Sequence, residues 1–297
     1  MINERRVAVA TATVWTRPEA TRDGDAPALA APSRLRAWTD GLTPADRSAL
    51  DGRVETQALL GDRVVVDEER PGWARIVLPG QPSSKDARGY PGWIPVGQLT
   101  DPAPAGPGSP AVVRVALTTL CDAPGGAPAL TDVSFATTLP VVGPAEAGWL
   151  PVRPAGADQP LWVAVGDVDA APTASPSGDD LIAAASTFLG LAYLWGGTSA
   201  LGLDCSGLVH LVFRRYGITV PRDAHDQAAA AAVQVDPADA ATGDLLFFAR
   251  PGADIHHVGF CAGAGRMLHA PETGRGVELE PLSDGRRETL VAAGRWR

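Results

Sequence analysis

Three side chains in the C-terminal part of the chain could together perform nucleophilic catalysis. Cys205 stands in the stretch GLDCSGLVH, directly ahead of an apolar run, and His257 and His269 follow in two short β-like segments. A cysteine attacks as its thiolate, and a helix N-terminus favours that negative charge. Histidine suits the role of base because its pKa lies near neutrality. The pattern allows a triad in which His257 accepts the proton of Cys205 and His269 orients His257.

Each of these residues also has a structural explanation. A cysteine ahead of an apolar helix is often a small core residue, and a histidine in a strand is often hydrogen-bonded within the fold. On these grounds we assign Cys121 and Cys261 to the core, and His210, inside the helix, to a structural role. Residue types and spacing alone leave the catalytic hypothesis open.

The elements that would position these residues form a predicted α+β domain over residues 177–297. Apolar spacing, capping residues and terminal glycines indicate helices near 179–190, 205–217 and 222–232, with Asp179 or Asp180 as the first cap. Strands are predicted near residues 244–250, 256–263, 266–270 and 276–281. Helices followed by a run of antiparallel strands indicate an α+β fold.

Two smaller β-rich domains are predicted ahead of this domain, over residues 1–102 and 108–170. The segments ERPGWARIVLPG and GYPGWIPVGQL of the first are weakly repeated as AEAGWLPVRPAG and QPLWVAVGDV in the second. Such repeated short strands favour two small all-β barrels of SH3-like type. A helical insertion in the first is indicated by Thr43-Pro44, a cap followed by a first-turn proline. Trp73, Trp149 and Trp162 are interpreted as barrel core.

The amino-acid composition restricts which cellular compartment and which binding partners are expected. The net charge is −9, and the 25 basic residues form no block, so nucleic acid and anionic membranes are poor partners. No apolar run approaches the roughly 20 residues of a membrane span, and the N-terminus makes a poor secretion signal. The three cysteines fit a reducing compartment, and no metal-type Cys or His pairing occurs. We therefore expect a cytoplasmic monomer without metal or cofactor.

Five motifs in order resemble the NlpC-type cell-wall cysteine peptidases, which have a papain-like core. The motifs are YLWGG, LDCSGLV, GDLLFF, HVGF and MLHAP, and they span the third predicted domain. With two SH3-like domains in front, the chain resembles the γ-D-glutamyl-L-diamino acid endopeptidases, of dipeptidyl-peptidase VI type. The segments VETQALLGDRV, RGYPGWIP and VPRDAHDQ resemble that subgroup's first barrel, a loop over the cleft and the region after the nucleophile helix.

The resemblance implies an activity and a set of site residues. The activity is hydrolysis of the bond between D-Glu and diaminopimelate or Lys in muropeptides with a free N-terminal L-Ala, in peptidoglycan recycling. It implies Cys205 as nucleophile, His257 as base and His269 as the orienting residue. The implied substrate-binding residues are Tyr193 near the oxyanion, Asp204 and Ser206 at the cleft, and Glu55, Tyr90 and Asp223 around the amine.

Other interpretations of these residues stay open. Glu55 could be a solvated surface charge, Tyr90 barrel surface and Asp223 a helix cap. Relatives commonly carry Ser where this chain has Ala224, which removes about one hydrogen bond, or ~1 kcal/mol. Two alternative functions are an endopeptidase acting on intact peptidoglycan and a non-catalytic module that binds wall peptides. The sequence does not decide between diaminopimelate and Lys, or whether the second β domain contacts substrate.

Overall fold

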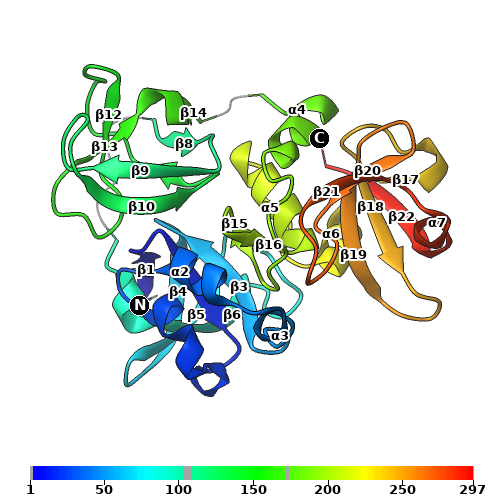
Figure 1. Cartoon of the computed structure of the whole chain (residues 1–297), viewed down its shortest axis with the longest axis horizontal. Coiled ribbons are helices and arrows are strands. Elements are labelled where there is room, and N and C mark those ends of the chain that lie inside the picture. The colour runs from blue at the N-terminus through cyan, green and yellow to red at the C-terminus, as the bar shows by residue number, and fades with distance from the viewer. Residues whose placement is uncertain (1–2, 103–108, 172–173, 297) are drawn as a thin grey trace.

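The computed structural model describes residues 3–102, 109–171 and 174–296, which form two β domains and a C-terminal α+β domain (Figure 1). Residues 1–2, 108 and 297 of the predicted domains, and the middle of the predicted linker at 100–111, lie outside the described residues. The layout is the predicted one, with two small SH3-like β domains preceding the larger domain. None of the helices in the described ranges is long and apolar enough to cross a membrane.

The first β domain is a seven-stranded antiparallel sheet in the order β3-β2-β6-β5-β4-β1-β7. Its strands are β1 (Glu4–Val7), β2 (Thr11–Trp15), β3 (Val54–Leu59), β4 (Arg63–Arg70), β5 (Trp73–Leu78), β6 (Tyr90–Pro95) and β7 (Leu99–Thr100). The helical insertion holds η1 (Pro18–Ala20), η2 (Asp23–Asp25), α1 (Ala26–Leu29), α2 (Leu35–Gly41) and α3 (Pro44–Ser48). Thr43 caps α3 as expected, in a capping box with Asp46.

The second β domain repeats the strand pairing of the first. It holds β8 (Ala111–Val113), β9 (Leu117–Cys121), β10 (Pro128–Ser134), β11 (Thr138–Leu139), β12 (Trp149–Val152), β13 (Leu161–Ala164) and β14 (Val168–Ala170). The orders β10-β9-β13-β12 and β11-β8-β14 match that of the first domain with one break. In both domains a 3-10 turn precedes the last strand, η3 (Val96–Gln98) and η4 (Val165–Asp167). The weak sequence repeat therefore marks a structural repeat.

The three tryptophans that were predicted as barrel core are not among the buried core residues of either barrel. Trp73, Trp149 and Trp162 are only half-buried, whereas Trp15 and Trp38 are buried and pack edge to face with ring centroids 6.1 Å apart. The reason is that small and β-branched side chains already fill these barrels.

The C-terminal domain packs helices against a six-stranded sheet in the order β17-β22-β18-β19-β20-β21. The helices are α4 (Gly178–Ser186), α5 (Cys205–Arg215), α6 (Ala224–Ala230) and α7 (Asp284–Thr289). The strands are β17 (Val233–Val235), β18 (Leu245–Ala249), β19 (Ile255–Cys261), β20 (Arg266–His269), β21 (Glu278–Pro281) and β22 (Leu290–Arg295), with the short turn η5 (Pro237–Asp239). A separate pair, β15 (Thr198–Ser199) and β16 (Gly202–Leu203), precedes α5.

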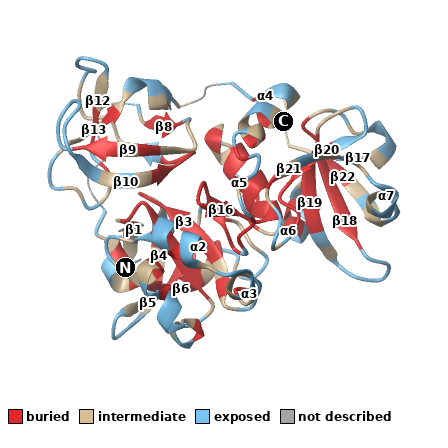
Figure 2. Ribbon diagram, viewed as in Figure 1, coloured by how far each residue is buried: buried red, intermediate tan, exposed pale blue. Residues whose placement is uncertain are grey.

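Helix α5 forms the centre of the molecule and is buried along nearly its whole length (Figure 2). Its apolar side chains pack against the β18 and β19 side chains, and Leu59 and Phe135 from the two β domains join the same core. The positive φ of Gly217 turns the chain just beyond the helix, at the predicted end. Ser177, rather than Asp179 or Asp180, caps α4, because Asp180 is the third helical residue and bonds back to Ser177.

Candidate active site

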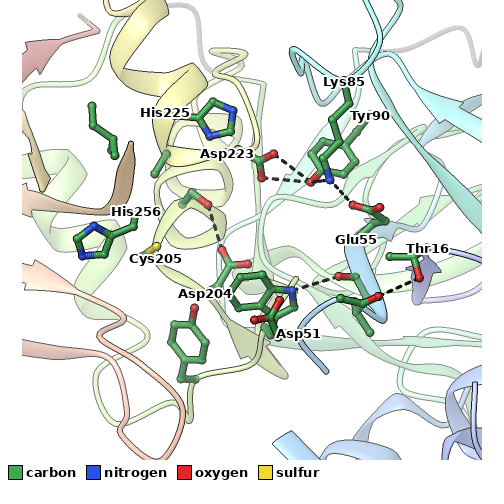
Figure 3. A pocket seen from close by; sticks show the side chains of 17 residues that line it. Thr16, Asp51, Glu55, Lys85, Tyr90, Asp204, Cys205, Asp223, His225 and His256 are labelled. Carbon is green, nitrogen blue, oxygen red and sulfur yellow. Dashed lines mark hydrogen bonds and ion pairs between the residues drawn. The ribbon is translucent and has the colours of Figure 1, made fainter. Parts of the chain in front are cut away.

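Cys205 is the first residue of α5 and lines a cleft of about 410 Å³ (Figure 3). Asp204 is the N-cap, and its Oδ1 accepts a hydrogen bond of 2.7 Å from the backbone N–H of Gly207. Cys205 is thus fixed at the start of a helix, where the helix meets the cleft. Only 8% of the residue is exposed, so the cleft is its route to a substrate.

The environment of Cys205 favours the neutral thiol. Burial raises its pKa to about 12, and the neighbouring Asp204 carboxylate acts in the same direction, while backbone hydrogen bonds from Val258 and Ser206 lower it. The helix start favours a thiolate, but burial and the capping carboxylate of Asp204 oppose it, so the pKa of Cys205 is raised rather than lowered. A base is therefore needed to remove the proton when the sulfur attacks.

His257 and His269 meet on neighbouring strands of the sheet. Strands β19 and β20 are antiparallel, with Phe260 opposite Leu268, and the histidine side chains lie on one face. His257 Nε2 and His269 Nδ1 are 2.7 Å apart. Both residues are buried, with His257 3% exposed. The backbone of Val258 lies close enough to the thiol of Cys205 to lower its pKa, so Cys205 lies beside the segment that carries His257.

A carboxylate fixes the proton positions in this pair. His269 Nε2 lies 3.1 Å from Oε1 of Glu280, and an ionised carboxylate only accepts hydrogen bonds. His269 therefore donates from Nε2 and, when neutral, accepts at Nδ1 from the Nε2–H of His257. Nδ1 of His257 is then left unprotonated and available as a base. Sequence reasoning missed Glu280, although the ELE alternation places Glu278 and Glu280 on one strand face beside His269.

The ionisation of His257 also suits a base. Burial and the neighbouring His269 lower its pKa well below 6.5, so the ring is neutral at neutral pH. The adjacent His256 points the other way, is exposed and lines the cleft directly. Since successive side chains of a strand alternate, only one of the two can join His269. The hydrogen bond selects His257 for that pair.

Three predicted amine-binding residues converge at the other end of the same cleft. Glu55 comes from β3, Tyr90 from β6 and Asp223 from the residue before α6, and all three line the cavity. The hydroxyl of Tyr90 donates to Asp223, 3.0 Å from its Oδ2. Tyr90 is 2% exposed, so it is not barrel surface. Asp223 stands at the N-cap position but makes no capping bond with its side chain, which leaves its carboxylate to the cleft.

A lysine that sequence reasoning overlooked completes this group. Lys85 Nζ forms an ion pair with Glu55 Oε2 and lies 2.8 Å from Tyr90 Oη (Figure 3). It belongs to the loop between β5 and β6. The segment expected to reach over the cleft is placed differently: Tyr90–Pro95 is strand β6, and the loop before it extends to the C-terminal domain.

Asp204 and Ser206 line the cleft, but their side chains are largely engaged within the protein. Arg222 is 1% exposed and donates to both oxygens of Asp204, at 2.9 and 2.6 Å, and to Ser206 Oγ at 2.9 Å. Asp204 Oδ2 also accepts from the N–H of Gly196. Their predicted role as substrate contacts stays a prediction, whereas their role in holding the helix start is visible.

Tyr193 lies beside the sulfur in the same cleft and is 7% exposed. Burial, followed by the nearby Cys205 and Asp204, raises the pKa of its hydroxyl, which keeps the proton on the oxygen. Arg47 of α3 fixes its backbone by donating to its carbonyl at 3.0 Å. A protonated hydroxyl in this place can donate to an oxyanion that forms beside the sulfur. Ala224 also lines the cleft.

The cleft is built by the first β domain and the C-terminal domain. Within the described ranges, none of the lining residues comes from 109–171. Trp195 Nε1 bonds to the carbonyl of Val54 at 3.2 Å, and Thr198 bonds to Gln57, so the two walls are joined directly. The second β domain contacts the C-terminal domain outside the cleft. There, Ser134 of the second β domain accepts a hydrogen bond from the N–H of Ala200.

Two clusters of described residues converge closely enough to share a metal ion. They are Asp223, His225 and Asp226, and His269, Glu278 and Glu280. In the first, Tyr90 and Ser84 donate to the carboxylates. In the second, Arg275 forms ion pairs with Glu278 at 2.6 Å and Glu280 at 3.3 Å. Both clusters are therefore explained by partners within the chain.

The C-terminal part of the chain matches a known protein family, and most of the chain matches two curated proteins. The model of the NlpC/P60 family matches residues 190–295. The γ-D-glutamyl-L-lysine dipeptidyl-peptidase of Bacillus subtilis (strain 168) is 38% identical over 283 residues, covering 93% of this chain and 92% of the relative. The protein of the same name from Bacillus cereus is 36% identical over 288 residues, covering 93% and 85%.

A solved structure resembles the whole molecule. The crystal structure of an NlpC/P60 family protein from Bacillus cereus ATCC 10987 has a TM-score of 0.89 and 33% sequence identity, and the match covers 99% of each chain. The likeness includes both β domains as well as the C-terminal domain, and it supports the predicted arrangement of SH3-like domains and a papain-like domain.

Proposed function

The chain belongs to the NlpC/P60 family of cysteine peptidases, and we propose that it acts on cell-wall muropeptides that carry a free N-terminal L-Ala. The bond cleaved is that between γ-D-Glu and the L-diamino acid, diaminopimelate or Lys, and L-Ala-γ-D-Glu is released. Two curated relatives are named for the corresponding γ-D-glutamyl-L-lysine activity, which supports this substrate class.

The observation that carries the proposal is the group of Glu55, Tyr90 and Asp223 in one cleft with Cys205. A cationic amine taken out of water needs acceptors that replace its hydration, and two carboxylates with a hydroxyl supply them. Lys85 already places a primary ammonium ion between Glu55 and Tyr90, so this spot accommodates such a group. An acetylated N-terminus brings no cation to these acceptors and is expected to be rejected.

The proposed reaction passes through a thioester on Cys205. His257 Nδ1 accepts the thiol proton as the sulfur attacks the γ-carbonyl of D-Glu, and the oxyanion receives a hydrogen bond from Tyr193. The C–N bond then breaks, and the amine of the diamino acid takes the proton from His257. Water, deprotonated by His257, attacks the thioester, releases L-Ala-γ-D-Glu and returns the proton to the sulfur.

We further propose a cytoplasmic role in peptidoglycan recycling, carried out by a monomer. All three cysteines are free and buried, which suits a reducing compartment. A peptide with a free N-terminal amine is not attached to glycan through that nitrogen, so the proposed amine-binding group favours a processed, soluble substrate.

The test is incubation with L-Ala-γ-D-Glu-meso-diaminopimelate, its L-Lys analogue and the N-acetylated forms. We expect release of the diamino acid, and kcat/KM for the acetylated peptide lower by about 10- to 100-fold because the half-buried carboxylates of Glu55 and Asp223 receive no cation from it. Cys205→Ala and His257→Ala should remove activity, while the matched His256→Ala variant should keep most of it. Failure of the wild type to cleave either free tripeptide contradicts the proposal, and equal cleavage of acetylated peptide favours an endopeptidase of intact wall.

A further inference from the structure

The ammonium group of Lys85 occupies the place proposed for the substrate amine. Its Nζ pairs with Glu55, lies 2.8 Å from Tyr90 Oη and sits 4.6 Å from the centre of the Tyr90 ring. Tyr90 in turn donates to Asp223. Lys85 is the only lysine of the chain, so this side chain is the one primary amine that the sequence places in the site.

The loop that carries Lys85 is held in place from both sides. Its Ser84 N–H donates to Asp226 Oδ2 at 2.9 Å, and Arg88 forms ion pairs with Asp67 and Asp86 at 2.7 and 2.8 Å. Gly89 has a φ of +141°, and a Cβ there would meet the carbonyl oxygen of Leu78 at 2.1 Å. The backbone is therefore fixed above the cleft.

The Lys85 side chain, by contrast, can leave without disturbing that backbone. It is 41% exposed, compared with 20% for the Glu55 side chain. An ion pair that is partly solvated contributes little net free energy and exchanges readily with water. Two ammonium ions cannot share Glu55 and Tyr90, because like charges at contact repel.

We propose that Lys85 is a tethered occupant of the amine subsite, which the substrate's own α-amine displaces. This inference rests on the function proposed above. In the free protein, Lys85 compensates the charge of Glu55 and Asp223. A peptide with a free amine replaces one ion pair by another, whereas a peptide without a cation would have to expel Lys85 and leave Glu55 unpaired. Lys85 thereby favours peptides with a free amine over peptides without one, and it weakens the binding of both.

Replacing Lys85 by a neutral residue should therefore tighten binding of the substrate. For Lys85→Gln, KM for L-Ala-γ-D-Glu-meso-diaminopimelate is expected to fall by about two- to fivefold, with kcat within twofold of the wild type. The matched control is Arg75→Gln, which removes the same charge from an exposed position on β5 of the same domain and should leave KM unchanged. Thermal melts of both variants check that the fold is retained.

A binding measurement separates this inference from the proposed function. In a Cys205→Ala background, calorimetry should show the same two- to fivefold tightening of the tripeptide when Lys85 is replaced by Gln. Binding that is unchanged or weaker in the Lys85→Gln variant overturns the tethered occupant, because Lys85 would then be neutral or would assist the substrate. Absence of cleavage by the wild type, by contrast, overturns the proposed function.

Discussion

At the scale of single residues, Glu280 controls the protons of the two histidines. Its carboxylate accepts from His269, which leaves Nδ1 of His257 unprotonated. Burial lowers the pKa of His269 to about 4, and the charge and hydrogen bond of Glu280 offset part of that effect. Arg275 fixes the carboxylate from the other side. Glu280 thus positions, through His269, the proton that the proposed mechanism requires.

Glu280→Gln should lower kcat by on the order of 10- to 100-fold, with KM nearly unchanged, because an amide can present either a donor or an acceptor to His269. In the wild type, activity should decline at acid pH only below 6.5, where His257, whose pKa is lowered, becomes protonated. The charge of Glu280 raises the pKa of His269, which is hydrogen-bonded to His257, so removing that charge should move the decline of this coupled pair to still lower pH. The measurement is kcat and kcat/KM against pH.

The matched control is Glu278→Gln. Glu278 lies 3.4 Å from the same nitrogen, but Arg275 holds its Oε1 at 2.6 Å, so its loss should have a smaller effect. A merely structural Glu280 would lower thermal stability without shifting the pH profile. That result would contradict the positioning role.

At this scale the sequence located side chains whose chemistry is distinctive and missed those that act through a neighbour. Cys205, His257 and His269 could be selected from residue type and motif. Glu280 and Lys85 are ordinary surface charges in the sequence, and only the pairing of distant segments brings each to its partner. The burial that raises the pKa of Cys205 could not be judged from a helix start.

At the scale of elements, Gly207 allows helix α5 to approach the preceding loop. A Cβ on Gly207 would meet the carbonyl oxygen of Gly197 at 2.0 Å and Asp204 Oδ1 at 2.9 Å. The first turn of α5 therefore packs directly on the backbone of the segment that also carries Trp195, and this contact holds Cys205 at the cleft.

Gly207→Ala should destabilise the fold by about 1–3 kcal/mol, because overpacking against backbone exceeds the gain in helix propensity. Activity should fall with it, since the helix start moves. Gly41→Ala is the matched control: Gly41 is helical, has nothing within 4 Å of an added Cβ, and should be neutral or slightly stabilised. Urea unfolding measures both, and equal stability of the two variants would contradict the close-packing argument.

Helices and strands with strong local signals were predictable, and those defined by pairing were not. Capping residues and apolar spacing located α5 and α6, and β-branched or aromatic runs located β18 and β19. Strand β22 was missed because LVAAGR lacks such a run, yet it lies beside β18 in the middle of the sheet, where Ala292 stands opposite Phe247. Its small side chains serve close packing, which no local pattern shows.

At the scale of the molecule, the first β domain forms part of the cleft that holds Cys205. Arg222 joins Asp204 and Ser206 of the nucleophile segment to Thr56 of β3, whose hydroxyl accepts from Arg222 Nε at 2.8 Å. The sequence indicated two β domains and their repeat, but not this interface. Arg222 in VPRDAHDQ has no local feature that names a partner 166 positions away. The order of the domains can be predicted from local composition. The contacts between domains cannot, because each contact surface is assembled from several distant segments.

Thr56→Val tests whether that interface holds the catalytic segment. The hydroxyl of Thr56 also donates to Gln81 Oε1 at 2.7 Å, so valine, which has nearly the same shape, leaves Arg222 Nε and Gln81 Oε1 without these partners in a buried place. We expect a loss of about 2–3 kcal/mol in the free energy of unfolding, followed by urea denaturation. We also expect a lower kcat/KM, because Arg222 holds the Asp204 cap beside Cys205.

The same substitution at Thr13, a buried residue of β2 whose hydroxyl finds no partner among the described residues, should leave the free energy of unfolding almost unchanged. If the two valine variants are equally stable and equally active, the first β domain supplies only a wall to the cleft, and the helix start is held by the C-terminal domain alone.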